Sequence, residues 1–110
     1  MVSIQDLKSI QEQEIQKVKD WFDFVVTTPV QYTNGLWYEP EYSQQYYTLL
    51  QKYLDDNMTL TIWDVSGKPE NAREMTKQEL IELTKFLADI YERAYQEKKS
   101  NLAKIKVING

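Results

Sequence analysis

The sequence contains neither cysteine nor histidine among its 110 residues. Without cysteine there is no disulfide, no zinc–thiolate site and no cysteine nucleophile. Without histidine the chain lacks the commonest general base and the commonest transition-metal ligand. We therefore expect a protein that is not an enzyme and uses no metal or other cofactor, with chemistry by carboxylates alone as the remaining enzymatic alternative.

Long apolar runs are missing as well. No window approaches the ~20 apolar residues of a membrane helix, and the first six residues enter an amphipathic pattern, not a secretory leader. This favours a soluble protein without a membrane partner. The chain is rich in aromatic residues, with three Trp, eight Tyr and three Phe, which is typical of a folded chain. Its length suits one domain, and we take residues 1–110 as that domain.

The formal net charge is −4, and acidic residues gather in the middle of the chain. Residues 29–75 hold seven acidic and three basic side chains. This excess argues against direct binding of nucleic acid, which depends on neutralising phosphates with lysine and arginine. The basic residues near the C-terminus are explained locally, because cations stabilise the end of a helix.

The first segment, residues 3–26, is predicted to be a helix. Ser3 is a suitable N-cap, with Asp6 three residues later completing a capping box. Residues 11–14 interrupt the apolar stripe, so the first half of the helix is expected to be weakly packed or packed on a partner. The stripe consists of Ile4, Leu7, Ile10, Ile15, Val18, Phe22 and Val25.

Residues 29–38 carry the sharpest local pattern, a hairpin around Asn34-Gly35. Asn-Gly favours a two-residue type I′ turn, in which both residues have positive φ. Such a turn would place Tyr32 opposite Trp37 as an aromatic cross-strand pair.

The remainder predicts a helix over 40–56, a strand over 58–64, a short strand over 72–75 and a long helix over 77–105. Thr76 and Glu79 form the capping box of that last helix. The order α-β-β-α-β-β-α indicates an α+β fold with a small antiparallel sheet of three to four strands. We divide the domain into a helical arm (1–28), a hairpin, helix and strands (29–75) and a long helix (76–106).

Aromatic residues around the hairpin are the first candidates for a binding site. Trp and Tyr anchor protein interfaces, because they bring a large contact area with little loss of side-chain entropy. A hairpin packed on a helix would use the same residues as core, and we favour that interpretation for Trp37 and Tyr46. The predicted protein-interaction residues are Trp37, Tyr38, Tyr42 and Tyr47.

Carboxylates offer two weaker candidates. Asp55, Asp56 and Asn57, with Asp64, could bind a hard cation, but their spacing matches no calcium loop. A solvated helix end is the favoured explanation. Glu39 and Glu41 could act as a glycosidase pair. Acids favoured at a helix start explain them better, so we predict no catalytic, metal-binding or cofactor-binding residue.

Several short motifs follow one another in an order found in a known domain family. They are Pro29-Val30-x-Tyr32, Asn34-Gly35, Trp37-Tyr38, Leu60-Thr61-Ile62-Trp63-Asp64, Met75-Thr76-x-x-Glu79-Leu80-Ile81-x-Leu83 and Lys99-x-x-Leu102-x-x-Ile105. Over roughly residues 15–105 the chain resembles a family of unknown function from phages and prophages. Its members occur at the ends of tail-fibre-like proteins or as short proteins encoded near tail genes. These motifs are signatures of a fold, so the resemblance assigns no catalytic residue.

The resemblance implies a phage-encoded, non-enzymatic protein that acts as a structural or assembly module of the tail. Its partner would be another tail protein, bound through the long helix and the aromatic residues of the hairpin. The alternative is a small acidic factor that binds and inhibits a host protein, occupying a nucleic-acid-binding groove by charge complementarity. The expected location is the bacterial host cytoplasm or the virion. A homo-oligomer through the long C-terminal helix is a further possibility.

Overall fold

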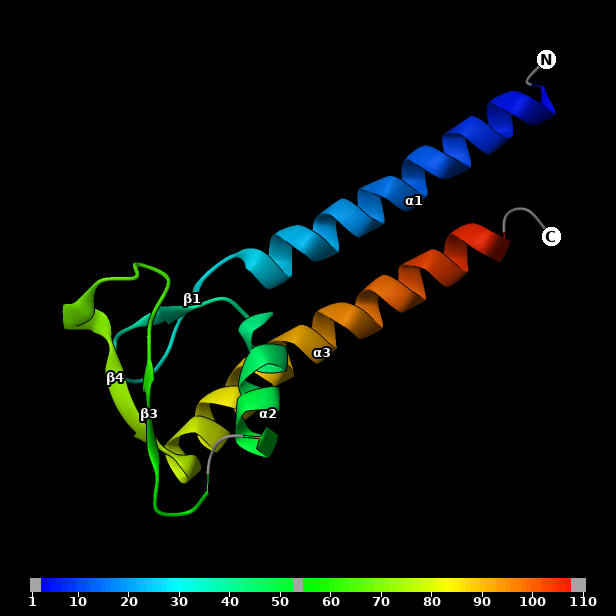
Figure 1. Cartoon of the computed structure of the whole chain (residues 1–110). Helices are drawn as coiled ribbons and strands as arrows, with labels where there is room; N and C mark the ends of the chain where they lie inside the picture. Colours follow the sequence, from blue (N-terminus) through cyan, green and yellow to red (C-terminus); the bar gives the residue numbers. More distant parts are fainter. Residues whose placement is uncertain (1–2, 53–54, 108–110) are drawn as a thin grey trace.

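The helices and strands follow one another in the order predicted from the sequence. The computed structural model describes residues 3–52 and 55–107, and Figure 1 shows how their elements are arranged. Along the chain these elements are α1 (Ile4–Thr27), β1 (Val30–Gln31), β2 (Trp37–Tyr38), α2 (Tyr42–Lys52), β3 (Thr59–Ile62), the 3-10 turn η1 (Pro69–Asn71), β4 (Arg73–Thr76) and α3 (Lys77–Val107). The fold is α+β, with a long C-terminal helix.

Both long helices begin with the capping boxes that the sequence predicts. In α1 the Ser3 hydroxyl accepts a hydrogen bond from the Asp6 N–H at 3.1 Å, and the Asp6 carboxylate accepts one from the Ser3 N–H at 3.3 Å. In α3 the same exchange joins Thr76 and Glu79, at 3.2 and 3.1 Å. Each box satisfies two donors that the first turn of a helix leaves without an intrahelical partner.

The four described strands form two antiparallel ladders rather than one continuous sheet. β1 pairs with β2, and β3 pairs with β4 from Thr59 opposite Thr76 to Ile62 opposite Arg73. A backbone hydrogen bond joins the two ladders, donated by the Val65 N–H to the Trp37 carbonyl at 3.0 Å. The predicted short strand beside β3 is confirmed as β4.

The hairpin is confirmed, but its predicted turn and register are wrong. Gln31 pairs with Trp37, and the Tyr32 N–H donates to the Leu36 carbonyl at 2.8 Å, so three residues form the loop. Gly35 has a φ of 84°, whereas Asn34 has no positive φ, which rules out a type I′ turn. The Asn34 side chain instead accepts from the Leu36 N–H at 2.9 Å. Tyr32 therefore does not face Trp37.

We call the part made by residues 28–52 and 55–90 the head. Its core lies where α2 and the first turns of α3 meet the two ladders, so side chains distant in sequence close around one another. Tyr38, Leu80, Leu83 and Leu87 are fully buried. The buried cluster consists of Leu36, Tyr38, Tyr46, Ile62, Met75, Leu80, Leu83 and Leu87.

We call α1 together with residues 91–107 of α3 the arm. The two helices run antiparallel and side by side (Figure 1). A second, smaller cluster of Phe22, Val26 and Ala94 joins them at the base of the arm. The Phe22 and Tyr91 rings pack edge-on with their centroids 5.4 Å apart, and the Lys98 ammonium lies 4.3 Å from the Phe22 centroid. The Glu41 N–H donates to the Val26 carbonyl at 3.0 Å, which ties this base to the head.

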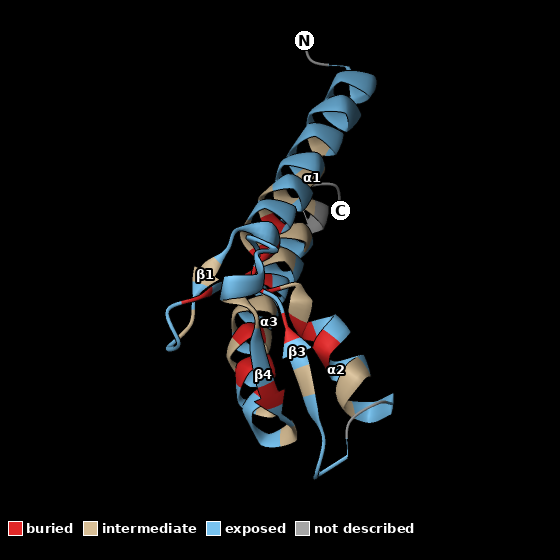
Figure 2. Ribbon diagram, turned by 60° about the vertical axis from the view of Figure 1, so that its left-hand side comes forward, coloured by how far each residue is buried: buried red, intermediate tan, exposed pale blue. Residues whose placement is uncertain are grey.

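The arm makes the molecule long. Its extents are 66 × 25 × 20 Å, and its radius of gyration is 18.9 Å, compared with ~13 Å for a compact chain of this length. Burial decreases along α1 towards its N-terminus (Figure 2). Ile4, Leu7 and Ile10 are all exposed. The first half of α1 is thus weakly packed within the chain, as the interrupted stripe predicts.

Candidate protein-interaction surface

The four aromatic residues predicted to bind a partner do not form one site. Tyr38, predicted as an interaction residue, has 0% of its surface exposed and lies in the head core. Asn34 donates a hydrogen bond to its phenol oxygen at 3.2 Å. Burial raises the pKa of the Tyr38 phenol above its usual value. Tyr38 is therefore a structural residue, and its prediction as a surface contact is wrong.

Trp37 departs from its prediction in the opposite direction, because it is exposed and not buried. Its side chain is 45% exposed, so the expectation that it belongs to the core is wrong. In a strand, neighbouring side chains point to opposite faces, and here Tyr38 takes the inward one. Trp37 remains a candidate contact residue. The core interpretation of Tyr46 is confirmed, since this ring is buried beside Tyr38.

Tyr42 is half-buried and lies in a small groove of about 340 Å³ between α2 and β3. The centroids of the Tyr42 and Tyr46 rings lie 6.1 Å apart, and Trp63 lines the same groove. Burial, and then a hydrogen bond to Glu39, raise the pKa of the Tyr42 phenol to about 12. The phenol is thus a neutral hydrogen-bonding group at physiological pH.

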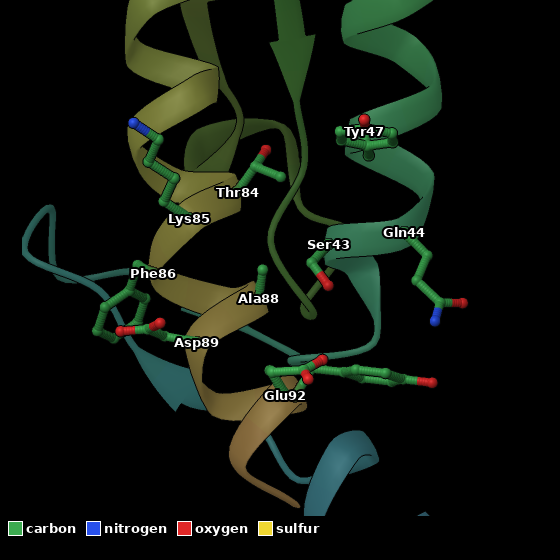
Figure 3. Close-up of a pocket in the computed structure, with 10 residues that line it drawn as sticks. Ser43, Gln44, Tyr47, Thr84, Lys85, Phe86, Ala88, Asp89 and Glu92 are labelled. Atoms are coloured by element: carbon green, nitrogen blue, oxygen red, sulfur yellow. The ribbon is translucent and has the colours of Figure 1, made fainter. Parts of the chain in front are cut away.

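Tyr47 is 59% exposed on α2 and belongs to a larger groove of about 810 Å³ between α2 and α3. Figure 3 shows Tyr47 on one wall and Thr84 and Lys85 on the other. The groove is lined by Ser43, Gln44, Tyr47, Thr84, Lys85, Phe86, Ala88, Asp89, Tyr91 and Glu92.

The chemistry of this α2/α3 groove suits an apolar side chain of a protein partner. Ser43, Thr84 and Ala88 are small, which lets a second backbone approach closely. The Thr84 hydroxyl already donates to the Leu80 carbonyl at 2.6 Å, so an apolar occupant deprives it of no partner. Two acids, Asp89 and Glu92, lie at one end.

Sequence reasoning missed this groove, although one sign of it was present. Ser43 and Tyr47 are four residues apart on α2, and Thr84 and Ala88 are four apart on α3, so each pair shares a helix face. Small residues on facing helices indicate a close approach or a hollow, and the sequence alone does not show which helices face one another.

The carboxylate candidates are also separated by the fold. Asp64 is buried, and its carboxylate accepts from the Ser66 hydroxyl at 2.5 Å and from the Ser66 N–H at 2.9 Å. These hydrogen bonds, the hydroxyl first, hold the pKa of Asp64 below its usual value. Asp56 instead pairs with Lys77 at 3.5 Å. Across residues 3–52 and 55–107 no group of three or more acidic residues is placed to hold a metal ion.

Comparison with known proteins found no family model, no curated protein and no solved structure that matches this chain. Among the helices that the structure describes, none is long and apolar enough to cross a membrane. The resemblance to the phage domain family therefore stays a prediction.

Proposed function

We propose that this is a non-enzymatic bacteriophage protein that binds another phage protein in the structure or assembly of the tail. The observation that carries the binding role is the α2/α3 groove, with Tyr47 exposed on its wall. Soluble proteins tend to bury large aromatic side chains, and those that stay exposed beside a groove are typical anchors of interfaces.

The shape of the groove favours a helix or an extended segment of the partner. The groove runs along α3 from Thr84 to Glu92 beside one turn of α2, and its small side chains leave room for apolar side chains of the partner. Asp89 and Glu92 would then meet a basic residue at the rim, where charges mainly set orientation and association rate. Trp37, exposed on β2, supplies a second contact on the head.

The phage and tail part of the proposal rests on the motifs of the hairpin, of β3 and of the start of α3. Several of these motif residues are buried in the head, including Tyr38, Ile62, Met75 and Leu80. Residues with such a role maintain a fold and leave the binding surface free to vary between members of a family.

The alternative function, inhibition of a host protein, is favoured by the acidic head. Asp55, Asp56, Glu70 and Glu74 are exposed. Such a surface complements a basic groove that normally binds nucleic acid. Binding of this kind weakens steeply with salt, because exposed charges are screened.

The test is genetic complementation in the phage or prophage that encodes the chain. The coding region is deleted, and particles are scored by electron microscopy of tails and by infectious titre. Either the wild-type protein or the Ala88→Arg variant is then supplied in trans. This variant places a long charged side chain in the groove. Ala103→Arg is the matched control, because Ala103 is exposed on the same helix outside the groove.

We expect the deletion to give defective tails, and wild type and Ala103→Arg to restore them. Ala88→Arg should restore the titre at least about tenfold less well, which corresponds to about 1.4 kcal/mol of lost binding. Normal tails and normal titre after deletion would refute the tail role. In that case, salt-sensitive binding to a purified host protein would support the alternative.

A further inference from the structure

α1 carries a second stripe of side chains, which runs beside its contact with α3 and shares Trp21 with that contact. Its members follow at alternating intervals of three and four residues, the spacing that keeps side chains on one face of a helix. They are Leu7, Ile10, Glu14, Lys17, Trp21 and Phe24. We call this stripe the α1 seam.

Apart from Trp21, the α1 seam lies outside the cluster that packs on α3. The contact with α3 uses Phe22 and Val26, which are buried against Ala94. On the seam, by contrast, Leu7 is 53%, Ile10 52% and Phe24 68% exposed. Trp21 is half-buried, because it also packs against the cluster that joins α1 to α3. Three large apolar side chains of one helix thus face solvent, Leu7 and Ile10 together and Phe24 near the other end of the seam, and a second copy that covered them would remove their apolar surface from water.

The order of apolar and charged side chains along the α1 seam is the same from either end of the helix. From either end, two apolar side chains come first, then two oppositely charged ones, then two more apolar ones. When a second α1 lies antiparallel with Leu7 opposite Phe24 of the second copy, Ile10 faces Trp21 of that copy. Glu14 then faces Lys17 of that copy, and by symmetry every one of these contacts occurs twice.

We propose that two copies of this chain associate through antiparallel packing of their α1 seams about a twofold axis. This goes beyond the proposed function and does not depend on it. Within one chain Lys17 already lies 3.0 Å from Glu14. In the pair, the two ion pairs become a group of four alternating charges at the centre, flanked by apolar contacts.

Charge selects the antiparallel direction. In a parallel pair each side chain meets its own copy, so Glu14 would face glutamate and Lys17 would face lysine. Like charges across an interface are unfavourable, whereas the antiparallel pair has opposite charges at both positions. The leucines of α3 cannot form such a contact between copies. Leu80, Leu83 and Leu87 are already buried within the head.

The size of the α1 seam sets the expected strength. From Leu7 to Phe24 the helix rises ~26 Å, and a helix is ~10 Å wide, so one seam covers on the order of 260 Å². This is well below the ~800 Å² that each partner contributes to a stable complex. We therefore infer a reversible dimer, populated only at high protein concentration or where a larger assembly brings two copies together.

The test measures solution mass by sedimentation equilibrium over the widest concentration range that solubility allows. Lys17→Glu places four acids at the centre and Glu14→Lys places four bases there. Each should raise the dimer dissociation constant by at least about tenfold. The double variant, with both charges exchanged, keeps opposite signs in register and should dimerise like wild type. An equal mixture of the two single variants should form heterodimers that neither forms alone.

Lys19→Glu is the matched control, because it makes the same charge change at an exposed position of α1 outside the seam. It should leave the dissociation constant unchanged. The chain has no cysteine, so a single cysteine at Gln5 or Gln16 carries a unique spin label. The antiparallel pair separates two Gln5 labels by ~30 Å along the helix axis and brings two Gln16 labels together.

A parallel pair would bring both labels together, and that distance pattern would overturn the proposal. A chain that stays monomeric at every concentration, or a dimer that responds equally to Lys17→Glu and Lys19→Glu, would overturn it as well. Circular dichroism of each variant confirms that α1 stays helical, so that a lost dimer is not a lost helix.

Discussion

The head and the arm share α3, yet they bury it to different degrees. In the head, Leu80, Leu83 and Leu87 are completely buried by α2 and the two ladders. In the arm, Leu102 and Ile105 on the same helix are only half-buried, because α1 alone lies beside them. Two helices cover each other on one side only, whereas the head surrounds its leucines.

This difference separates two sources of helix stability. The arm depends on local signals, such as the Ser3 capping box and side-chain pairs one turn apart, including Gln16 with Asp20. The head depends on tertiary burial, which contributes most of the stability of helices in proteins. We therefore expect the head to unfold as one cooperative unit and the tip of the arm to fray independently.

The largest effect should come from the head core. Leu83→Ala removes a fully buried side chain and leaves a cavity, so we expect a loss of about 3 kcal/mol in the free energy of unfolding. Urea denaturation measures it. Glu82→Ala, at the exposed neighbouring position, should change this free energy by less than ~0.5 kcal/mol. A small effect of Leu83→Ala would mean that the head is not the stable region.

Two phenylalanines of the same helix compare the two faces of the arm. Phe22→Ala should cost about 2 kcal/mol, because the burial of Phe22 against Tyr91 and Lys98 is lost. Phe24→Ala should cost the monomer almost nothing, because Phe24 faces solvent. Hydrogen exchange after Phe22→Ala should accelerate in α1 and leave residues 80–87 protected. Equal stability losses for the two variants would contradict this division.

Asp64, which follows β3 in the head, makes a pH-dependent interaction with Ser66. Asp64→Ala deprives the Ser66 hydroxyl and N–H of their acceptor and should cost about 1.5 kcal/mol at neutral pH. Because folding lowers the pKa of Asp64, its stabilising contribution is complete above the ordinary pKa of 3.8 and is lost as pH falls through the folded value. Thermal melts should therefore show the wild type and the variant converging in acid. A difference that persists there would exclude the carboxylate as the cause.

The smallest effect should come from the tip of the arm. Ser3→Ala removes one half of the capping box and should cost the first turns of α1 about 0.5 to 1 kcal/mol. These turns do not pack on the head, so the urea midpoint of the head should stay constant. Only the helical signal in circular dichroism should fall slightly. A shifted midpoint would show that the arm and the head unfold together.

Local patterns predicted the elements and their order, because caps, spacing and turn residues act within a few positions. Thr76 and Glu79, for example, start α3 at the predicted residue. The hairpin register could not be predicted the same way, because Asn-Gly fits both a two-residue turn and a three-residue loop with glycine at its end. A register shift reverses which side chains face inward.

The candidate interaction surface was harder to predict than the elements, since exposure depends on contacts between distant segments. Tyr38 and Trp37 are adjacent and equally suited to a core or an interface, and only the packing of the head assigns Tyr38 to the inside. The α2/α3 groove arises from residues about 40 positions apart in sequence, at Tyr47 and Ala88. No pattern within either helix encodes that distance.

Tyr91 belongs to two surfaces at once. It lines the α2/α3 groove, and its ring packs edge-on against Phe22 at the base of the arm. Any occupant that repositions this ring also changes the free energy with which α1 is held on α3. By thermodynamic reciprocity, a change in how firmly the arm is held alters the affinity of the groove by the same factor. For such an occupant, binding at the groove and packing of the arm would be linked through one shared aromatic ring.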